Sequence, residues 1–264
     1  MKKQIIAIVA LALLAVALCA GLAEAQPLNV VATIFPAYDW AREIAGDDGD
    51  VSLTLLLEAL GDGAKAEETV EGMEAEDEEE EAGEIEYDEH VWLSLRNAKA
   101  LTTALAAALG EAAPEKAAAF TANAEAYAAK LDALDAAYAE AVDAAGVRTI
   151  LFGDRFPFRY LADDYGLDYY AAFSGCSAES EASFETIVFL AGKVDALALP
   201  AVLTIEGADH RIAETVVQAT QAKDAAILTL DSLQSATAAD VEGGATYLDA
   251  MADNLEVLKQ ALNR

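Results

Sequence analysis

The chain has 264 residues, of which 55% are hydrophobic, 16 are Lys or Arg and 47 are Asp or Glu, and its formal net charge is −31. This apolar content excludes a wholly disordered chain, and the length fits one large domain or two smaller lobes. The negative charge repels phosphate backbones and anionic lipid headgroups, so nucleic-acid binding is disfavoured.

The N-terminus predicts export. Two lysines precede an apolar run over residues 5–18, and Ala23-Glu24-Ala25 has the small-x-small pattern of a signal-peptidase site. We expect residues 1–25 to be a signal peptide. Two alternatives stay open, because Cys19 is a candidate lipidation site and the apolar stretch nearly reaches the length of a membrane anchor. All three interpretations place the rest of the chain outside the cytoplasm.

The next part of the chain predicts a β-α-β unit and then an acidic loop. Residues 28–35 and 51–57 are almost continuously apolar, as in strands covered on both faces, and residues 38–45 have helical spacing. From Glu67 to Glu89, 14 of 23 residues are acidic and none is basic. We expect this acidic loop to be solvated and mobile.

Two helices are predicted in the middle of the chain. The first covers residues 95–109 and should end at Gly110, shortly before Pro114. The second covers residues 115–145, which contain no Gly or Pro and carry a single apolar stripe. About thirty helical residues at ~1.5 Å each extend ~45 Å, which is long enough to connect two lobes.

After Gly146 the chain predicts alternating strands and helices. Strands are expected at 147–152, 168–173, 201–205 and 226–230, with helices at about 156–165, 183–196, 209–222 and 246–262. Strands separated by helices of this length form right-handed crossovers. The C-terminal half therefore predicts a complete α/β unit with a four-stranded parallel sheet.

Four polar residues lie where such a sheet would bind a ligand, beyond the carboxyl ends of its strands. They are Asp154, Glu206, Asp231 and His90, the last of which precedes a helix expected to return onto the sheet. Three carboxylates and one imidazole suit Zn²⁺ or Mn²⁺. Each also has a structural interpretation, because Asp favours helix N-termini and turns, and a histidine flanked by acids can lie on the surface.

The motifs of common enzyme classes are absent. The sequence contains no GxGxxG after a strand, no P-loop, no GxSxG, no HExxH and no CxxC. We therefore expect a protein that is not an enzyme.

Several segments resemble the metal-binding substrate-binding proteins of bacterial ABC transporters, the zinc and manganese receptors of the ZnuA, TroA and PsaA type. The most specific is Asp88-Glu89-His90-Val91-Trp92-Leu93-Ser94, which resembles the family's DPHVWLS segment. Weaker matches lie at residues 30–36 with Asp39, 152–156 with 165–167, 175–181, and Leu230-Asp231-Ser232. The acidic loop also stands where zinc-binding members carry a His- and acid-rich loop.

The resemblance implies an α/β fold of two parallel-sheet lobes joined by one long rigid helix, with a metal between the lobes. Residues 26–114 would form the N-terminal lobe, with the acidic loop at 67–89. Residues 115–146 would form the linking helix and residues 147–264 the C-terminal lobe. The implied function is to bind Zn²⁺, alternatively Mn²⁺, and to deliver it to an ABC permease and its ATPase. The protein would be a monomer in the periplasm or at the outer face of the cytoplasmic membrane, touching the membrane only through an anchor or the permease.

The chain departs from the family pattern at two ligands. Carried over by position, the ligands include His90 and Asp231, but a third falls on Gly153, so the neighbouring Asp154 is the expected substitute, with Glu206 completing the set. The family's first histidine has no counterpart, because after Leu57 the chain passes directly toward the acidic loop. We therefore expect a shortened N-terminal lobe. The alternative function is a degenerate family member that acts in cell-surface structure or adhesion without specific metal capture.

Overall fold

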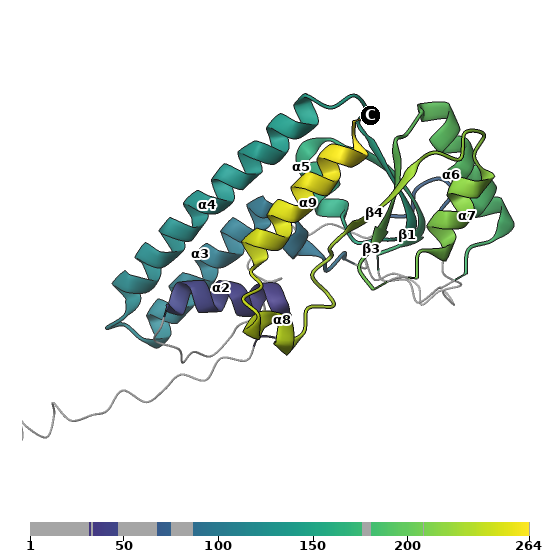
Figure 1. The fold of residues 1–264 in the computed structure, drawn as a ribbon. Coiled ribbons are helices and arrows are strands. Elements are labelled where there is room, and N and C mark those ends of the chain that lie inside the picture. Colours follow the sequence, from purple (N-terminus) through teal and green to yellow (C-terminus); the bar gives the residue numbers. More distant parts are fainter. Residues whose placement is uncertain are drawn as a thin grey trace, which may run out of the picture.

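The computed structural model describes residues 32, 34–46, 68–74, 87–175, 181–207 and 209–263. Within these residues a group of long helices lies beside one β-sheet that is flanked by helices on both faces (Figure 1). The predicted signal peptide, the strand at 51–57 and almost all of the strand at 28–35 lie outside the described residues.

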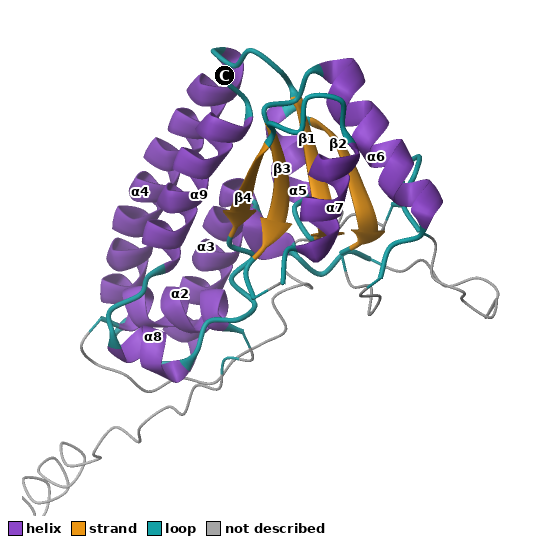
Figure 2. Cartoon of the chain, turned by 45° about the vertical axis from the view of Figure 1, so that its right-hand side comes forward, coloured by secondary structure: helices purple, strands orange, loops and turns teal. Residues whose placement is uncertain are grey.

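The sheet has four strands in the order β2-β1-β3-β4, and every pair is parallel. The strands are β1 (Thr149–Phe156), β2 (Asp168–Ser174), β3 (Ala201–Ile205) and β4 (Ala226–Leu230). The predicted four-stranded parallel sheet is thus confirmed, and β3 and β4 have the predicted bounds. The strands end at the same edge of the sheet (Figure 2), where Glu206 and Asp231 directly follow β3 and β4. Asp154, expected after the first strand, lies inside β1 because that strand continues to Phe156.

Strand β1 extends beyond its predicted end at residue 152. Its pairing with β2 is irregular between Phe152 and Arg155 and then continues to Phe156. The predicted helix at 156–165 therefore begins later, as α5 (Arg159–Tyr165). The expected boundary was wrong because pairing with β2, rather than local pattern, holds residues 153–156 in the strand.

Helices cover both faces of the sheet. Helices α6 (Phe184–Leu197) and α7 (Arg211–Ala219) pack on one face, and α5 and α9 (Tyr247–Ala261) on the other (Figure 2). Side chains of β3 alternate accordingly, since Val202 joins the cluster under α6 and α7 while Leu203 joins the main core. Cover on both faces explains why the central strand β3 is buried along its whole length.

The helical group contains α2 (Phe35–Ala45), α3 (Leu95–Ala112) and α4 (Ala117–Asp143), together with α9 (Figure 1). The 27-residue α4 confirms the predicted long helix. The expected end of α3 at Gly110 was wrong, because Gly110 lies inside the helix, where an added Cβ would come 3.1 Å from the Cβ of Ala117. Glycine at this position lets the two helices approach closely at their junction.

Two shorter elements were not predicted correctly. Helix α2 begins at Phe35, the expected last residue of a strand, because Pro36 fits the first turn of a helix. Helix α8 (Ala238–Glu242) was not predicted, and a reciprocal capping pair, Thr237 and Asp240, fixes its start. None of the helices in the described ranges combines the length and apolar character needed to cross a bilayer.

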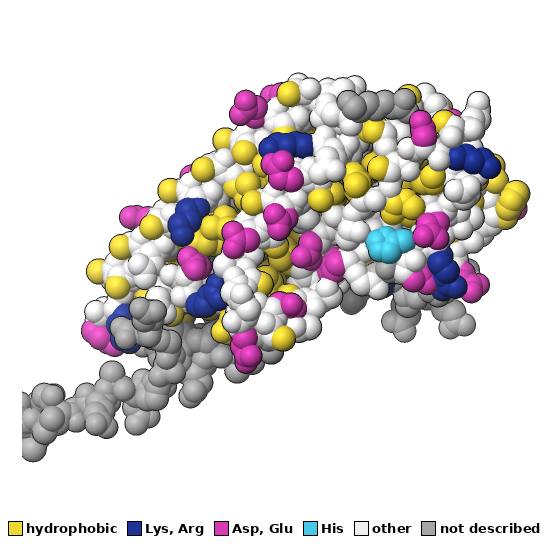
Figure 3. All heavy atoms as spheres, viewed as in Figure 1, with side chains coloured by type: hydrophobic (Ala, Val, Ile, Leu, Met, Phe, Trp, Pro, Cys, Tyr) yellow, Lys and Arg dark blue, Asp and Glu magenta, His cyan; other side chains and the backbone are white. Residues whose placement is uncertain are grey.

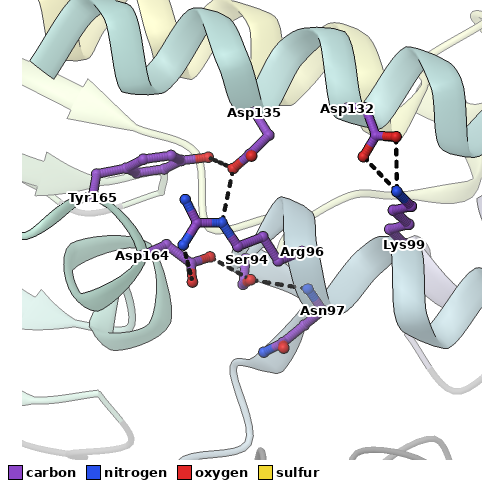
Figure 4. Close-up of polar contacts among 8 residues, drawn as sticks. All are labelled: Ser94, Arg96, Asn97, Lys99, Asp132, Asp135, Asp164 and Tyr165. Atoms are coloured by element: carbon purple, nitrogen blue, oxygen red, sulfur yellow. Dashed lines mark hydrogen bonds and ion pairs between the residues drawn. The ribbon is translucent and has the colours of Figure 1, made fainter. Parts of the chain in front are cut away.

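Polar contacts fasten α4 to α5 and to the start of α3 (Figure 4). The Arg96 Nε lies 3.2 Å from the Asp135 Oδ1, and the Tyr165 hydroxyl donates to the same oxygen at 2.9 Å. The Ser94 Oγ accepts from the Asn97 N–H, which caps α3, and donates to Asp164. These contacts fix the segment that directly follows His90.

Part of the acidic loop is ordered against the C-terminal sheet, contrary to expectation. The Glu74 N–H donates to the Ala172 carbonyl at 3.0 Å, and an added Cβ on Gly72 would come 2.1 Å from the Phe189 ring. The Lys193 Nζ lies 3.4 Å from the Glu71 Oε2. In residues 68–74, therefore, the side chains of Glu68 and Glu71 are exposed, while the backbone pairs beside β2 and packs on α6.

Candidate metal site

His90 is buried and its ring is held in one orientation. Its side chain is 2% exposed, and Nδ1 lies 2.8 Å from the Asp88 Oδ1. The same oxygen accepts the His90 backbone N–H at 2.8 Å, and the Tyr160 hydroxyl donates to the Asp88 carbonyl at 2.7 Å. A carboxylate on Nδ1 leaves Nε2 as the nitrogen that can bind a metal, which is the arrangement common around zinc-binding histidines.

Gly175 lies against the His90 ring. A Cβ at this position would stand 3.0 Å from Cε1 and 3.2 Å from Nδ1 of the imidazole, and 3.1 Å from the Phe156 carbonyl oxygen. The end of β2 therefore forms one wall of the site, and the absence of a side chain there leaves room for the ring.

Trp92 connects the His90 segment to the turn after β4. The two ring centroids are 5.3 Å apart, and the indole Nε1 donates to the Ser232 carbonyl at 2.9 Å. The Trp92 carbonyl accepts from the Tyr247 hydroxyl at 2.6 Å. Through the Trp92–Ser232 bond, residues that are 140 positions apart bring His90 close to the turn that begins with Asp231.

The backbone of Asp231 is clamped by Asn254, a buried residue of α9. Asn254 Oδ1 accepts the Asp231 N–H at 2.8 Å, and its Nδ2 donates to the Asp231 carbonyl at 2.8 Å. The Asp231 Oδ1 accepts the Leu233 N–H at 2.7 Å. Burial raises the pKa of Asp231 above its ordinary value, partly offset by that hydrogen bond, and the nearby carboxylate of Glu206 raises it further.

Glu206 holds the same turn with both carboxylate oxygens. The Oε2 accepts the Ser232 N–H at 2.7 Å, and the Oε1 accepts the Ser232 hydroxyl at 2.7 Å and the N–H groups of Gln234 and Ser235 at 3.2 and 3.4 Å. A carboxylate with four donors around it has little capacity left for a metal. Its assignment as a ligand stays a prediction, and these contacts favour a structural role.

Asp154 is likewise engaged by the backbone. Its Oδ1 accepts the Arg155 N–H at 2.8 Å, and its Oδ2 accepts the Ile205 N–H at 3.3 Å, which joins β1 to the end of β3. The neighbouring Gly153 has no room for a side chain, since a Cβ would come 2.5 Å from the Ala213 Cα. Asp154 as a substitute ligand stays a prediction, and it too has a structural function here.

The structure thus connects the segment of His90 to the turn of Asp231 through the Trp92–Ser232 hydrogen bond, and it gives Asp154 and Glu206 backbone partners. Asp88, Glu89 and His90 are a set of potential ligands whose donor atoms lie within 4.8 Å of one another. Sequence reasoning did not select Asp88, Trp92 or Asn254. The first two were visible only as part of the DPHVWLS-like segment, and nothing in the sequence marked Asn254.

On the face of the molecule drawn in Figure 3, charged side chains are spread out rather than concentrated in one patch. Acidic groups stand over the helical group and again beside α6 and α7, with few basic groups between them (Figure 3). This distribution agrees with the net charge of −31 and gives the surface a field that attracts cations without itself forming a specific site.

Comparison with known proteins gives matches over most of the chain. Residues 53–261 match the family model described as "ZnuA: Zinc-uptake complex component A periplasmic". The zinc-binding lipoprotein AdcA of Streptococcus pneumoniae is 29% identical over 318 aligned positions, which cover 100% of this chain and 62% of that protein. The chain therefore spans about three fifths of the length of that relative. The high-affinity zinc uptake system protein ZnuA of Bacillus subtilis is 25% identical, with 90% of this chain and 89% of that protein covered.

Solved structures share the fold. The Zn(II)-bound ZnuA-like domain of S. pneumoniae AdcA superposes with a TM-score of 0.65 at 27% identity, covering 90% of this chain and 100% of the domain. The periplasmic zinc-binding protein TroA of Treponema pallidum superposes with a TM-score of 0.66 at 22% identity, covering 91% of this chain and 100% of that one. Both comparisons extend well beyond the four-stranded sheet.

Proposed function

Because this chain belongs to the ZnuA family of zinc-uptake components, we propose that it is an extracytoplasmic solute-binding protein that captures Zn²⁺ and delivers it to an ABC permease with its ATPase. The names of its relatives support zinc as the cargo, with Mn²⁺ as the alternative. The family consists of binding proteins, and the protein acts without catalysis. It works as a monomer in the periplasm or at the outer face of the cytoplasmic membrane.

The observation that carries this proposal is the buried His90 whose Nδ1 is held by Asp88 at 2.8 Å. Burying an imidazole and a carboxylate costs desolvation free energy, which their mutual hydrogen bond offsets. A metal bound to Nε2 would give the second ring nitrogen of His90 a partner as well. We assign His90 Nε2 and the Asp231 carboxylate as the protein ligands, because donors engage both carboxylate oxygens of Asp154 and of Glu206, whereas the Leu233 N–H engages Oδ1 of Asp231. Water would complete the coordination, so affinity should be lower than in a closed four-ligand zinc site.

We also propose the two-lobe organisation with a shortened first lobe. The alignment with the S. pneumoniae relative extends over 318 positions, more than the 264 residues of this chain, which supports a loss of residues relative to that protein. In this proposal residues 26–114 form the N-terminal lobe, α4 within residues 115–146 is the linking helix, and residues 147–264 form the C-terminal lobe.

Calorimetric titration of the purified protein with Zn²⁺ and Mn²⁺ tests the function. We expect one stoichiometric site that is lost in His90→Ala and in Asp231→Ala. The chain offers a control, because His210, its other histidine, pairs with the Thr204 hydroxyl at 3.0 Å and is not one of the proposed ligands. His210→Ala should therefore keep the site. If the wild-type protein binds only several weakly held ions, and His90→Ala changes nothing, the proposal is wrong.

One observation favours the second candidate, a degenerate family member that acts at the cell surface without specific metal capture. Gly153 stands where the resemblance places a third ligand, and the Ala213 backbone occupies the space of a side chain there. The titration separates the two candidates, since a degenerate protein would keep its fold and lack the stoichiometric site.

A further inference from the structure

We propose that Trp92 is a positioning residue that sets the separation between the two ligands of the metal site, through the hydrogen bond from its indole to the Ser232 carbonyl. This inference rests on the proposed function, because it concerns the assembly of the same site. It assigns Trp92 a function beyond filling the core, and it assigns Glu206 and Asn254 to the support of the turn that Trp92 contacts.

Trp92 stands between the two halves of the site. It is 6% exposed, lies two residues after His90 and places its ring 5.3 Å from the imidazole. Its indole N–H reaches the Ser232 carbonyl, one residue after Asp231, at 2.9 Å. This hydrogen bond links the segment of His90 directly to the turn of Asp231.

The turn itself is rigidly held from the opposite side. Asn254 bonds both the N–H and the carbonyl of Asp231, and Glu206 accepts from Ser232, Gln234 and Ser235. Leu233 within this turn has φ +63°, a conformation that a leucine adopts only when its surroundings impose it. Because the turn cannot adjust freely, the position of the indole determines how far Asp231 lies from His90.

The other side of Trp92 is held as well. Its carbonyl accepts from the hydroxyl of Tyr247, which is fully buried on α9 and whose own N–H donates to Asp39 of α2 at 2.9 Å. Helix α9 thus contributes both Tyr247, which holds Trp92, and Asn254, which holds Asp231. Positioning of this kind increases affinity by lowering the ordering that binding would otherwise require.

The chain contains a matched control for the test. Its only other tryptophan, Trp40 on α2, is buried too, but its Nε1 has no hydrogen-bond partner among the residues that the structure describes. Trp92→Phe and Trp40→Phe therefore make the same change in size, and only the first removes a hydrogen bond. Zinc affinity is measured by calorimetry, and the geometry of the site by the visible absorption of bound Co²⁺.

We expect Trp92→Phe to weaken zinc binding by about 10- to 100-fold, which is typical for loss of an outer partner of a metal site, and to shift the Co²⁺ spectrum. Trp40→Phe should change the affinity by less than about 3-fold and leave the spectrum unaltered. The inference is overturned if Trp92→Phe binds zinc with the affinity and Co²⁺ spectrum of the wild type. In that case the proposed function stands, whereas absence of a stoichiometric site in the wild type removes both.

A second variant covers the possibility that phenylalanine disturbs folding. In the Trp40→Phe background Trp92 is the single tryptophan, so growth on benzothienylalanine replaces only its indole N–H by sulfur and keeps the ring size. The same loss of affinity is expected for this protein. Affinity equal to that of the tryptophan-containing background would overturn the inference.

Discussion

Replacing Glu206 with glutamine keeps the length of the side chain and removes its charge and one acceptor oxygen. Glutamine can place its remaining oxygen at the Oε1 position, near the Ser232 hydroxyl and the N–H groups of Gln234 and Ser235. Its amide nitrogen then faces the Ser232 N–H, which donated to Oε2 at 2.7 Å. That N–H loses its partner and meets another donor.

The expected cost follows from these contacts. A hydrogen bond to a charged group contributes ~1.5–3 kcal/mol, and a neutral one ~0.5–1.5 kcal/mol. One charged bond is lost and the bonds at Oε1 become neutral, while partial exposure of Glu206 reduces each effect. We expect the free energy of unfolding to fall by about 2–3 kcal/mol.

Urea unfolding of the metal-free protein measures this change, with Glu125→Gln as the control because Glu125 is an exposed residue of α4. The control should shift the free energy of unfolding by less than about 0.5 kcal/mol. If Glu206→Gln changes the free energy of unfolding as little as the control does but abolishes the zinc site, Glu206 is a ligand and the structural assignment is wrong. If it lowers stability and leaves a weakened site, the carboxylate supports the turn.

Three further predictions test other parts of the structure. Gly153→Ala should lower the free energy of unfolding by about 2–3 kcal/mol, because its Cβ would stand 2.5 Å from the Ala213 Cα. Gly192→Ala in α6, with open space around it, should raise the free energy of unfolding by up to ~1 kcal/mol. Thermal unfolding of both variants tests this difference, and equal effects would contradict the packing argument. Burial raises the pKa of Asp39 above 3.8, although the Tyr247 N–H and Arg42 act to lower it. As the pH rises from 3.8 to this raised pKa, the unfolded chain loses the proton before the folded protein does, so the free energy of unfolding falls. Asp39→Asn should remove this fall, and a constant difference in stability between variant and wild type across pH 3–7 would refute the prediction. Gly72→Ala should release residues 68–74 from α6, because its Cβ would overlap the Phe189 ring at 2.1 Å and its φ is +89°. Limited proteolysis should then cleave this segment faster than in the wild type, and equal protection would count against the packing of this segment on α6.

Local pattern was sufficient for most of the C-terminal half. Strands β3 and β4 have the bounds that their short, mainly apolar runs predicted. In β3 this pattern reflects burial along the whole strand, whereas β4 lies at the edge of the sheet and is only partly buried. The long helix α4 was also predictable from local pattern, because a single apolar stripe at helical spacing in a segment without Gly or Pro is typical of a helix. The motif that includes His90 and the turn at Asp231 were likewise recognisable from residue type and order alone.

Contacts between distant segments decided the rest. Pairing with β2 extended β1 past residue 152, and the close approach of α4 kept Gly110 inside α3. The same holds for the site, where Asp154 lies inside β1 rather than after it, and Glu206 follows β3 as predicted. Both have the right chemistry for a metal but accept N–H groups from Ile205 and from the turn at Ser232. A sequence shows which side chains can bind a metal, but only the tertiary structure shows which of them are already engaged by the backbone, because those partners come from other strands and turns.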